Sequence, residues 1–574
     1  MKYLSALFVA FVAVQVVAQQ PAPSATPAAA TEIDGGAPAY LRPETAEQRA
    51  ARVGPVDPGL NPDPKQAFYR YGKRYHIEKY DNRWVVMTGG DPGWARPYGF
   101  ANIYKEIYQK NDKFTWFWFE DKDEAAQEIA NAAATPSAAA PWSDLQLKYF
   151  KSVRAEFSPL TPQDSGRTVS FVESSEGLPK EGSWRNTLAI ADMNGDGFAD
   201  IIAPPERAGT NSPAIFLGDG KGHWKFWQGV KWPHGLNYGS VVAADFNKDG
   251  KMDLAFGVHL DGVHVFLGDG KGNFTDASDG LPRDYPTRRI LVTDVDRDGY
   301  PDVVTISEGP TAIATSATNG NYAKLRVYLN RDGAKSWTGM NVAETTRQFG
   351  GDWLALGNFN GDAYPDFVAG SVYYGSSDIL YLSNGAKKWN FGGDTEGVVV
   401  PALSYFFANT TGKFSSKKLD DAVVSYFRQW PSQLEANIVP KPAVENVVGI
   451  DRISFAGGKA KRTSIMRWDG KRPVAAMGTG DFDGDGNMDI VFLRYDPLEF
   501  VLLLGDGKGG FTLAKTTGLV PASNATYDLQ VADVNGDGRP DIIIGYEAAG
   551  NTTLGARDGS IHVFLNTGVQ PAKK

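Results

Sequence analysis

Cysteine is absent from this 574-residue sequence, so the chain forms no disulfide and offers no thiolate as a ligand or nucleophile. Histidine is scarce: six residues are scattered along the chain, which argues against zinc or iron held by imidazole. The sequence also contains no GxSxG, HExxH or phosphate-binding loop. These absences argue against the best-marked hydrolase, metalloprotease and nucleotide-binding classes.

Basic charge is not in surplus, since 58 Lys and Arg face 67 Asp and Glu, for a formal net charge of −9. Binding to a phosphate backbone needs the opposite balance, so no nucleic-acid partner is expected. Long apolar runs are missing beyond the N-terminus, and no other run approaches the ~20 residues needed to span a bilayer. We therefore expect no membrane span.

The N-terminal apolar run from Tyr3 to Val17 follows a single Lys and ends in small residues. This pattern is typical of a cleavable signal peptide over residues 1–18, cut after Ala18, and an uncleaved anchor is the alternative. We expect the protein to be exported, to the periplasm or to the outside of the cell, where Ca²⁺ is plentiful. Loss of Lys2 with the signal peptide takes the formal net charge from −9 to −10.

Turn-forming residues are abundant, with 64 Gly and 34 Pro. They leave few stretches long enough for a helix, and this scarcity favours an all-β fold. A nine-residue pattern, D-x-[DN]-x-D-G-x-x-D, occurs at 192–200, 245–253, 294–302, 481–489 and 533–541. Oxygen side chains at positions 1, 3, 5 and 9, with a backbone carbonyl at position 7, suit a hard cation such as Ca²⁺. Glycine at position 6 permits the sharp turn that brings these oxygens together. Five bound Ca²⁺ ions would nearly neutralise the chain.

The chain divides into three parts after the signal peptide. Residues 19–65 are rich in Pro and Ala and predict an extended linker. Residues 66–165 are rich in aromatics and predict a small β-containing module of unknown type. From 166 to 574, each acidic loop lies between two apolar strands, and a third strand, a Gly-rich turn and a short fourth strand follow. Four short strands repeated in this way are typical of a β-propeller blade.

Two weaker copies complete the count of blades. Residues 358–366 keep the pattern but carry Asn358 at position 1 and Ala363 at position 6, and a further blade before residue 481 has lost its metal loop. The total predicts a seven-bladed β-propeller. Thr168–Val172 matches the fourth-strand pattern, whereas the last blade lacks a fourth strand of its own. We therefore expect 168–172 to pair with 561–566 and to close the ring, which removes a free sheet edge.

These motifs resemble the FG-GAP/VCBS repeat family, the propeller type also found in integrin α-subunits and in some fungal and bacterial lectins. The resemblance implies that each nine-residue loop joins the first two strands of a blade and binds Ca²⁺ on one face of the ring. The implied side-chain ligands are Asp192, Asn194, Asp196, Asp200, Asp245, Asn247, Asp249, Asp253, Asp294, Asp296, Asp298, Asp302, Asp481, Asp483, Asp485, Asp489, Asp533, Asn535, Asp537 and Asp541. The implied carbonyl ligands at position 7 belong to Phe198, Lys251, Tyr300, Asn487 and Arg539. A sixth, weaker site would use Asn358, Asn360, Asp362 and Asp366.

We expect the calcium to be structural, because four chelating side chains and a carbonyl leave little open coordination for a substrate. Ligand binding would then use the opposite rim, where the loops vary in length. Aromatic and arginine side chains precede several first strands there, and they either suit a sugar or peptide or fill the gaps between blades. They are Trp184, Arg185, Tyr238, Tyr285, Arg288, Arg289, Trp353 and Tyr527.

The resulting hypothesis is a non-enzymatic binding or adhesion module for a glycan or protein ligand. One alternative is a polysaccharide-active lyase or hydrolase on a calcium-stabilised propeller, and another is a scaffold that docks a partner through residues 66–150. For the enzyme, carboxylates outside the metal loops could pair for glycoside chemistry. The candidates are Glu206, Asp261, Glu308, Asp496 and Glu547.

Overall fold

The computed structural model describes residues 158–570 and four strands between residues 68 and 119. Within 158–570 the described part excludes 208–210, 260, 284, 308–324, 343–350, 352, 371–379, 384, 386–388, 392–404, 430–445, 457–458, 523–525 and 548–558. The predicted signal peptide and the linker at 19–65 lie outside the described residues. No helix occurs in the described part, so none there is long and apolar enough to cross a membrane. The prediction of an all-β fold is confirmed.

The N-terminal strands form one antiparallel sheet in the order β1-β2-β3-β4. Their bounds are Phe68–Arg70, Lys73–Tyr80, Arg83–Thr88 and Thr115–Phe119. The nature of the module predicted at 66–165 stays a prediction.

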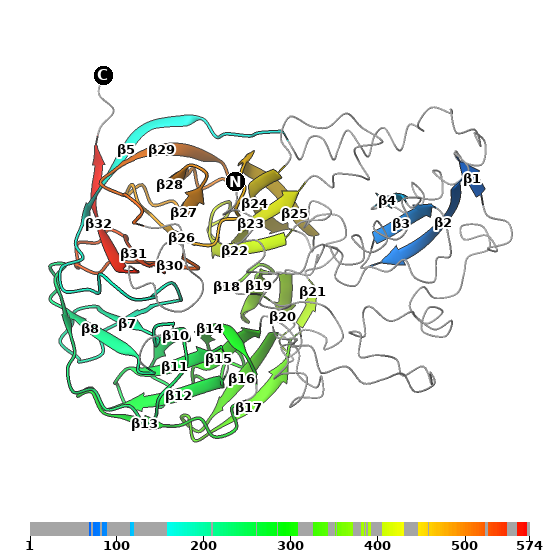
Figure 1. The fold of residues 1–574 in the computed structure, drawn as a ribbon. Helices are drawn as coiled ribbons and strands as arrows, with labels where there is room; N and C mark the ends of the chain where they lie inside the picture. The colour runs from blue at the N-terminus through cyan, green and yellow to red at the C-terminus, as the bar shows by residue number, and fades with distance from the viewer. Residues whose placement is uncertain are drawn as a thin grey trace, which may run out of the picture.

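The repeat region consists of consecutive four-stranded antiparallel sheets whose strands follow one another in chain order (Figure 1). The first contains β6 (Ala189–Ala191), β7 (Asp200–Ala203), β8 (Ala214–Gly218) and β9 (Trp224–Phe226). The second contains β10 (Gly239–Ala244), β11 (Asp253–Val258), β12 (Gly262–Gly268) and β13 (Phe274–Asp276). The third contains β14 (Thr287–Thr293), β15 (Asp302–Ser307), β16 (Leu325–Arg331) and β17 (Ser336–Asn341).

The fourth and fifth sheets follow the same order. The fourth contains β18 (Leu354–Gly357), β19 (Asp366–Ala369), β20 (Leu380–Ser383) and β21 (Trp389–Phe391). The fifth contains β22 (Tyr405–Gly412), β23 (Asp421–Gln429), β24 (Asn446–Ala456) and β25 (Lys459–Asp469). This fifth sheet is the blade that the sequence predicts without a metal loop.

The last sheet has eight strands, in the order β26-β27-β28-β29-β5-β32-β31-β30. Its members are β26 (Met477–Gly480), β27 (Asp489–Tyr495), β28 (Leu498–Gly505), β29 (Phe511–Thr517), β30 (Leu529–Ala532), β31 (Asp541–Gly545), β32 (Ile561–Gln570) and β5 (Asp164–Glu173). Strand β5 therefore lies between two groups of repeat strands that are more than 300 residues later in the chain (Figure 1).

Strand β5 closes the last repeat as the sequence predicts, although with a shifted register. It pairs antiparallel with β32, so that Thr168 faces Gln570 and Val172 faces Leu565. Residues 168–172 therefore pair with 565–570, which overlaps the predicted 561–566 only in part. It also pairs parallel with β29 of the preceding repeat, a contact that the sequence analysis missed. Strand β5, from the start of the repeat region, thus covers the edges of β29 and β32 at the end of the repeat region.

Successive sheets pack through their first strands, which contact one another in chain order from β6 to β30, and β30 in turn contacts β6. The core follows the same path as a series of clusters between neighbouring sheets. Ile201 and Phe216 of the first sheet, for example, share a cluster with Ile543 and Val563 of the last repeat. The second strands are covered on both sides, which explains why they are continuous runs of Ile, Val and other apolar residues rather than alternating ones. This is a β-propeller-like arrangement.

Candidate functional site

Each acidic loop joins the first two strands of its sheet, as the resemblance implies. Asp192 directly follows β6 and Asp200 begins β7, and the same holds for the loops after β10, β14, β26 and β30. The loops therefore share one end of the first strands, and the residues that precede these strands lie at the other end. This polarity separates the candidate metal sites from the candidate ligand-binding residues.

The start of each loop folds around the carboxylate at position 1. Asp192 accepts hydrogen bonds from the backbone N–H groups of Gly195 at 2.7 Å and Gly197 at 2.8 Å. Gly197, at position 6, has a φ of 90°, and the position-6 glycines of the other four full-pattern loops are also left-handed. The predicted reason for glycine at this position is thus confirmed.

The residue at position 4 also has a left-handed backbone conformation in every loop. Its type varies between loops, so the sequence does not identify this conformation. Glycine occupies position 4 in four of the six loops, but Lys248 has a φ of 61° and Arg297 a φ of 59°. A non-glycine residue in this region costs roughly 1–2 kcal/mol. The surrounding loop therefore imposes this conformation on two residues that do not prefer it.

The aspartate at position 9 has a second role, which the sequence analysis missed. Asp200 is fully buried, and its two carboxylate oxygens accept backbone N–H groups from Met193 in its own loop and from Gly218 at the end of β8, at 2.8 and 2.9 Å. The same pair of bonds recurs in the other loops, where the third-strand donors are Gly268, Asn330, Ser383, Gly505 and Asn566. Each of these donors follows a leucine, and that repeated Leu–small/polar pair is the signal that could have revealed the bond.

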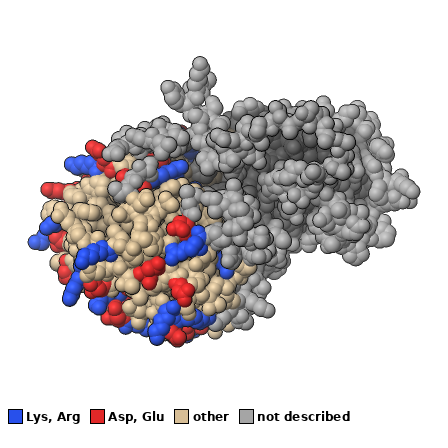
Figure 2. Space-filling view, turned by 60° about the horizontal axis from the view of Figure 1, so that its bottom comes forward, with Lys and Arg blue, Asp and Glu red and all other residues tan. Residues whose placement is uncertain are grey.

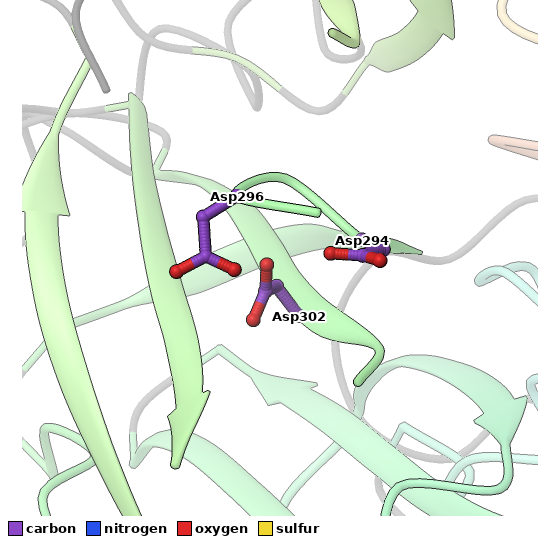
Figure 3. Close-up of side chains that lie close together, drawn as sticks. All are labelled: Asp294, Asp296 and Asp302. Atoms are coloured by element: carbon purple, nitrogen blue, oxygen red, sulfur yellow. The ribbon is translucent and has the colours of Figure 1, made fainter. Parts of the chain in front are cut away.

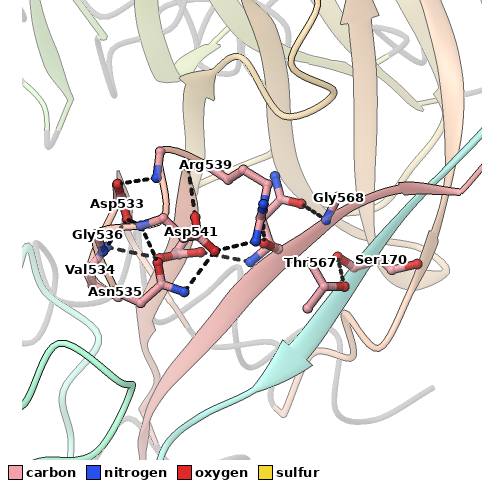
Figure 4. Close-up of polar contacts among 12 residues, drawn as sticks. Ser170, Asp533, Val534, Asn535, Gly536, Arg539, Asp541, Thr567 and Gly568 are labelled. Atoms are coloured by element: carbon pink, nitrogen blue, oxygen red, sulfur yellow. Dashed lines mark hydrogen bonds and ion pairs between the residues drawn. The ribbon is translucent and has the colours of Figure 1, made fainter.

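Two of these third-strand residues also connect neighbouring repeats. The side-chain amide of Asn330 donates to the carbonyl of Phe246, in the loop of the preceding sheet, at 2.8 Å. The side chain of Asn566 donates to the carbonyl of Phe482 at 2.9 Å in the same way. Figure 4 shows the loop of Asp533 and Asp541 with its hydrogen bonds to the adjacent strand residues. The loops at 245–253 and 481–489 are thus tied both to their own third strand and to the next sheet.

Burial raises the pKa of the position-9 carboxyls. The pKa is raised to about 6 for Asp200, Asp253 and Asp541 and to about 7 for Asp302 and Asp489. Desolvation is the main cause, the two backbone hydrogen bonds oppose it, and neighbouring loop carboxylates add to the increase. A bound cation would remove this penalty, because it stabilises the ionised form.

Two loops bring three carboxylates close enough to share one ion. Asp294, Asp296 and Asp302 form one group, whose side chains converge in Figure 3, and Asp481, Asp483 and Asp485 form the other. In the first group, Oδ1 of Asp294 is buried and accepts no hydrogen bond. A buried carboxylate oxygen without a donor, beside other carboxylates, fits a hard cation that would coordinate it. Along the rest of the described chain, no further group of three acidic, His or Cys side chains converges so closely.

Arginines from outside these two loops interact with the same carboxylates. Arg331, at the end of β16, lies 3.0 Å from Asp296 and 3.6 Å from Asp298. Arg167 of β5 forms an ion pair with Asp483 and lies 3.7 Å from Asp485. Both guanidinium groups therefore partly balance charge that a divalent ion would otherwise balance alone.

The weaker copy at 358–366 differs from the full loops at positions 1 and 6. The Asn358 amide donates a hydrogen bond to the carbonyl of Asp362, so a donor group occupies part of the position-1 site where the full loops have only carboxylate oxygens. Ala363, at position 6, is not left-handed. Asp366 keeps the bonds of position 9, at 2.8 Å from the N–H of Phe359 and 2.7 Å from that of Ser383. The structural bonds of position 9 thus persist where the metal pattern is altered.

The fifth sheet has no metal loop, but it keeps a buried aspartate at the place of position 9. Asp421 begins β23 and is buried, and Arg452 of β24 donates to it at 2.9 Å. Lys413 lies where the other loops carry their first aspartate, and it lies 2.9 Å from Asp420. A lysine and an arginine therefore lie here beside the aspartates, a contact set that the sequence analysis did not identify.

At the opposite end of the first strands, the structure brings five of the eight singled-out residues into one pocket. They are Arg185, Tyr238, Arg288, Arg289 and Tyr527, and Asn186, Thr187 and Gly239 also line it. Tyr285 and Trp353 are instead buried, and the Trp353 indole donates to the carbonyl of Ala475 at 2.9 Å. Trp184 packs edge-on against Phe216. The rings outside the pocket thus fill the space within and between sheets.

The spare carboxylates are mostly engaged by neighbouring groups. Glu547 forms a buried ion pair with Arg185, and Asp261 lies 3.1 Å from His264. Glu206 accepts the N–H of Ser183 at 3.2 Å, and Asp496 accepts that of Lys471 at 3.0 Å. Glu308 lies outside the described residues.

Comparison with known families matches the model of the FG-GAP-like repeat to residues 205–256 and 481–544. The model of the FG-GAP repeat matches residues 525–564. The chain carries FG-GAP repeats. The matched segments include three of the five full acidic loops, those at 245–253, 481–489 and 533–541.

Two curated relatives are integrin α-subunits. The chain is 28% identical to integrin alpha-PS2 of Drosophila melanogaster over 160 residues, which cover 26% of this chain and 11% of that protein. It is 28% identical to integrin alpha-6 of Gallus gallus over 166 residues, which cover 25% of this chain and 15% of that protein. The similarity thus spans only a small part of either integrin.

Solved structures with a similar course of the chain include BBS1N in complex with ARL6DN. The TM-score is 0.41 at 10% identity, over 69% of this chain and 97% of the solved one. The Vibrio cholerae biofilm matrix protein Bap1 gives a TM-score of 0.29 at 12% identity, over 66% of this chain and 76% of that protein.

Proposed function

We propose that the protein is an exported, calcium-stabilised, seven-bladed propeller that acts as a non-enzymatic binding or adhesion module. The count of seven takes the eight-stranded sheet as two blades that share β5. The observation that carries the metal part is the loop of Asp294, Asp296 and Asp302, in which three carboxylates converge and one buried oxygen lacks a donor. The likeness to integrin α-subunits supports a surface or extracellular location and a protein ligand, and the N-terminal apolar run supports export.

The proposed metal ligands are the loop residues at positions 1, 3, 5 and 9, with the carbonyl at position 7. Calcium would be structural, because the loops connect strands within a sheet and two of them also contact the next sheet through Asn330 and Asn566. Charged side chains of both signs alternate on the face in Figure 2 without a continuous basic surface, which supports a partner other than nucleic acid. The ligand, a protein or a glycan, would bind at the opposite end of the first strands.

An array of glycans and peptides tests the binding function. The protein, with calcium present, should be retained on a subset of spots while the ligand stays chemically unchanged. New reducing or unsaturated ends on a retained polysaccharide would instead establish the alternative of a lyase or hydrolase.

A further inference from the structure

The third-strand residue that bonds to the position-9 aspartate is of two kinds in the repeats with a full acidic loop. In three of these repeats it is a glycine, which offers a backbone N–H but no side chain. The glycines are Gly218, Gly268 and Gly505. In the other two repeats, with loops at 294–302 and 533–541, it is Asn330 and Asn566, and both are fully buried. Only the asparagines can reach a second loop through a side chain.

Asn330 connects two successive acidic loops through one amide group. Its Nδ2 donates at 2.8 Å to the carbonyl of Phe246, which is position 2 of the loop at 245–253. It also donates at 3.1 Å to the carbonyl of Pro301, which is position 8 of the loop at 294–302. An amide nitrogen carries two hydrogens, so both bonds form at once. The side chain of Asn330 thus fixes the spacing of the two loops.

A continuous path of hydrogen bonds joins the position-9 aspartates of these loops. Asp253 accepts the N–H of Phe246 at 2.8 Å, and the carbonyl of Phe246 accepts the side chain of Asn330. The N–H of Asn330 in turn donates to Asp302 at 2.7 Å. All four residues are fully buried, so water does not compete for these bonds. The backbone at Phe246 therefore cannot move without disturbing a residue that holds the other loop.

The last two repeats contain the same path. Asp489 accepts the N–H of Phe482 at 2.8 Å, and the carbonyl of Phe482 accepts the side chain of Asn566 at 2.9 Å. The N–H of Asn566 donates to Asp541 at 2.8 Å. The loop at 192–200 differs, because glycine is the third-strand residue both in its own sheet and in the next one. No side chain of this type can join that loop to either neighbour.

A second contact joins the loops at 245–253 and 294–302. Lys248, at position 4 of the first loop, is the lysine with a left-handed φ of 61°. Its Nζ lies 4.0 Å from the ring centroid of Tyr300, at position 7 of the second loop. Because the carbonyl of Tyr300 is a proposed metal ligand, this contact also links the two candidate sites.

We infer that calcium binds cooperatively in two pairs of loops, 245–253 with 294–302 and 481–489 with 533–541, and independently at 192–200. A loop that is ordered around an ion holds the buried asparagine, which in turn holds part of the paired loop. The paired loop then loses less conformational entropy when it binds, so its affinity is higher. Coupling of this kind changes affinity by about 5- to 150-fold and acts in both directions. The inference rests on the proposed calcium binding and specifies its regulation.

Hydrogen exchange of the full chain, measured by mass spectrometry across a series of free calcium concentrations, gives a calcium midpoint for each loop. Asp249→Asn removes one proposed ligand charge and should raise the midpoint of its own loop, 245–253. It should also raise the midpoint of 294–302 by about threefold or more, because the midpoint of two like sites shifts by the square root of their coupling. The midpoint of 192–200 should not change. Asp298→Asn should in return raise the midpoint of 245–253.

Replacement of the asparagine tests whether it carries the coupling. Asn330→Gly keeps the backbone N–H for Asp302 and reproduces the residue found in three other repeats. In this variant, Asp249→Asn should no longer shift the midpoint of 294–302. Asn566→Gly is the matched control, since the same change in the other pair should leave this coupling intact. If Asn330→Gly does not fold, Asn566→Gly combined with Asp485→Asn makes the same test on the loops at the end of the chain.

An unchanged midpoint of 294–302 in Asp249→Asn would overturn the inference, as would coupling that persists in Asn330→Gly. An equal shift of 192–200 would overturn the pairing. Independent midpoints in loops that do bind calcium overturn the coupling alone. Loops without any calcium-dependent protection would instead contradict the proposed calcium binding itself, so the two failures are distinguishable.

Discussion

Arg167 forms an ion pair with Asp483, and this contact joins the strand that closes the repeat region to an acidic loop more than 300 residues later. Arg167 belongs to β5, whereas Asp483 is position 3 of the loop between β26 and β27. The same strand pairs with β29 and β32, so the closure of the ring and the charge balance of one candidate metal site involve the same element.

The first prediction concerns this ion pair. In chelator, Arg167→Gln should lower the thermal midpoint relative to wild type, because the loop carboxylates then repel one another without a counter-charge. The side chain of Arg167 is about half exposed, so the loss should stay below about 1 kcal/mol. In calcium the two proteins should unfold alike, and a variant that is equally destabilised in both conditions would contradict this interpretation.

A matched pair of substitutions separates the structural role of position 9 from metal binding. Asp200→Asn removes one of two buried acceptors, so it should cost about 1–3 kcal/mol of unfolding free energy with or without calcium. Asp196→Asn keeps the acceptor oxygen for the N–H of Phe198 and removes only charge. It should therefore lower stability in calcium alone. Chemical denaturation in calcium and in chelator measures both, and identical profiles for the two variants would refute the distinction.

The closure strand gives a prediction about packing. Phe171 is buried in the cluster shared by the last two repeats, where its ring lies 6.2 Å from that of Phe482. Phe171→Ala should cost about 3–5 kcal/mol because it leaves a cavity. Val172, on the same strand, is 55% exposed, and Val172→Ala should change stability by less than about 0.5 kcal/mol. Equal effects on denaturant midpoints would show that β5 does not close the core.

The raised pKa values of the position-9 aspartates predict how the chelated protein responds to pH. In the unfolded chain these groups titrate near ~3.9, whereas burial raises the pKa of Asp302 to about 7 in the folded protein. Between these values the folded state binds more protons, so its stability should fall as pH rises from about 4 to about 7. Thermal midpoints measured in chelator across this range test the sign. A thermal midpoint that rises with pH in chelator would contradict the prediction. With calcium present, the midpoint should no longer fall as pH rises.

The repeating acidic loops and the strands around them were predictable from the sequence because each depends on local patterns: apolar runs, left-handed glycines and oxygen side chains at fixed spacing. Closure by Thr168–Val172 was predictable as well, since the last repeat lacked its fourth strand. The parallel pairing of this strand with β29 was not, because nothing in a single strand's sequence identifies a second partner.

The missed features of the site depend on contacts between distant segments. The N–H of Gly218 that binds Asp200, and the guanidinium of Arg452 that binds Asp421, are backbone and side-chain donors brought close only by the folded sheet. The aromatic residues before the first strands were identified, and Tyr285 and Trp353 follow the alternative in which they fill space between blades. Whether the ring of Tyr527 meets a ligand or the guanidinium of Arg185 depends on geometry across repeats.

Thermal unfolding with and without calcium, combined with a count of bound ions by equilibrium dialysis, tests the central claim most directly. The proposal of structural calcium in five loops predicts about five ions per chain. It also predicts a thermal midpoint that falls by several degrees or more in chelator, because each site occupied at a hundredfold excess over its Kd contributes about 2.7 kcal/mol. An unchanged midpoint in chelator, or a chain that binds no calcium, would contradict it.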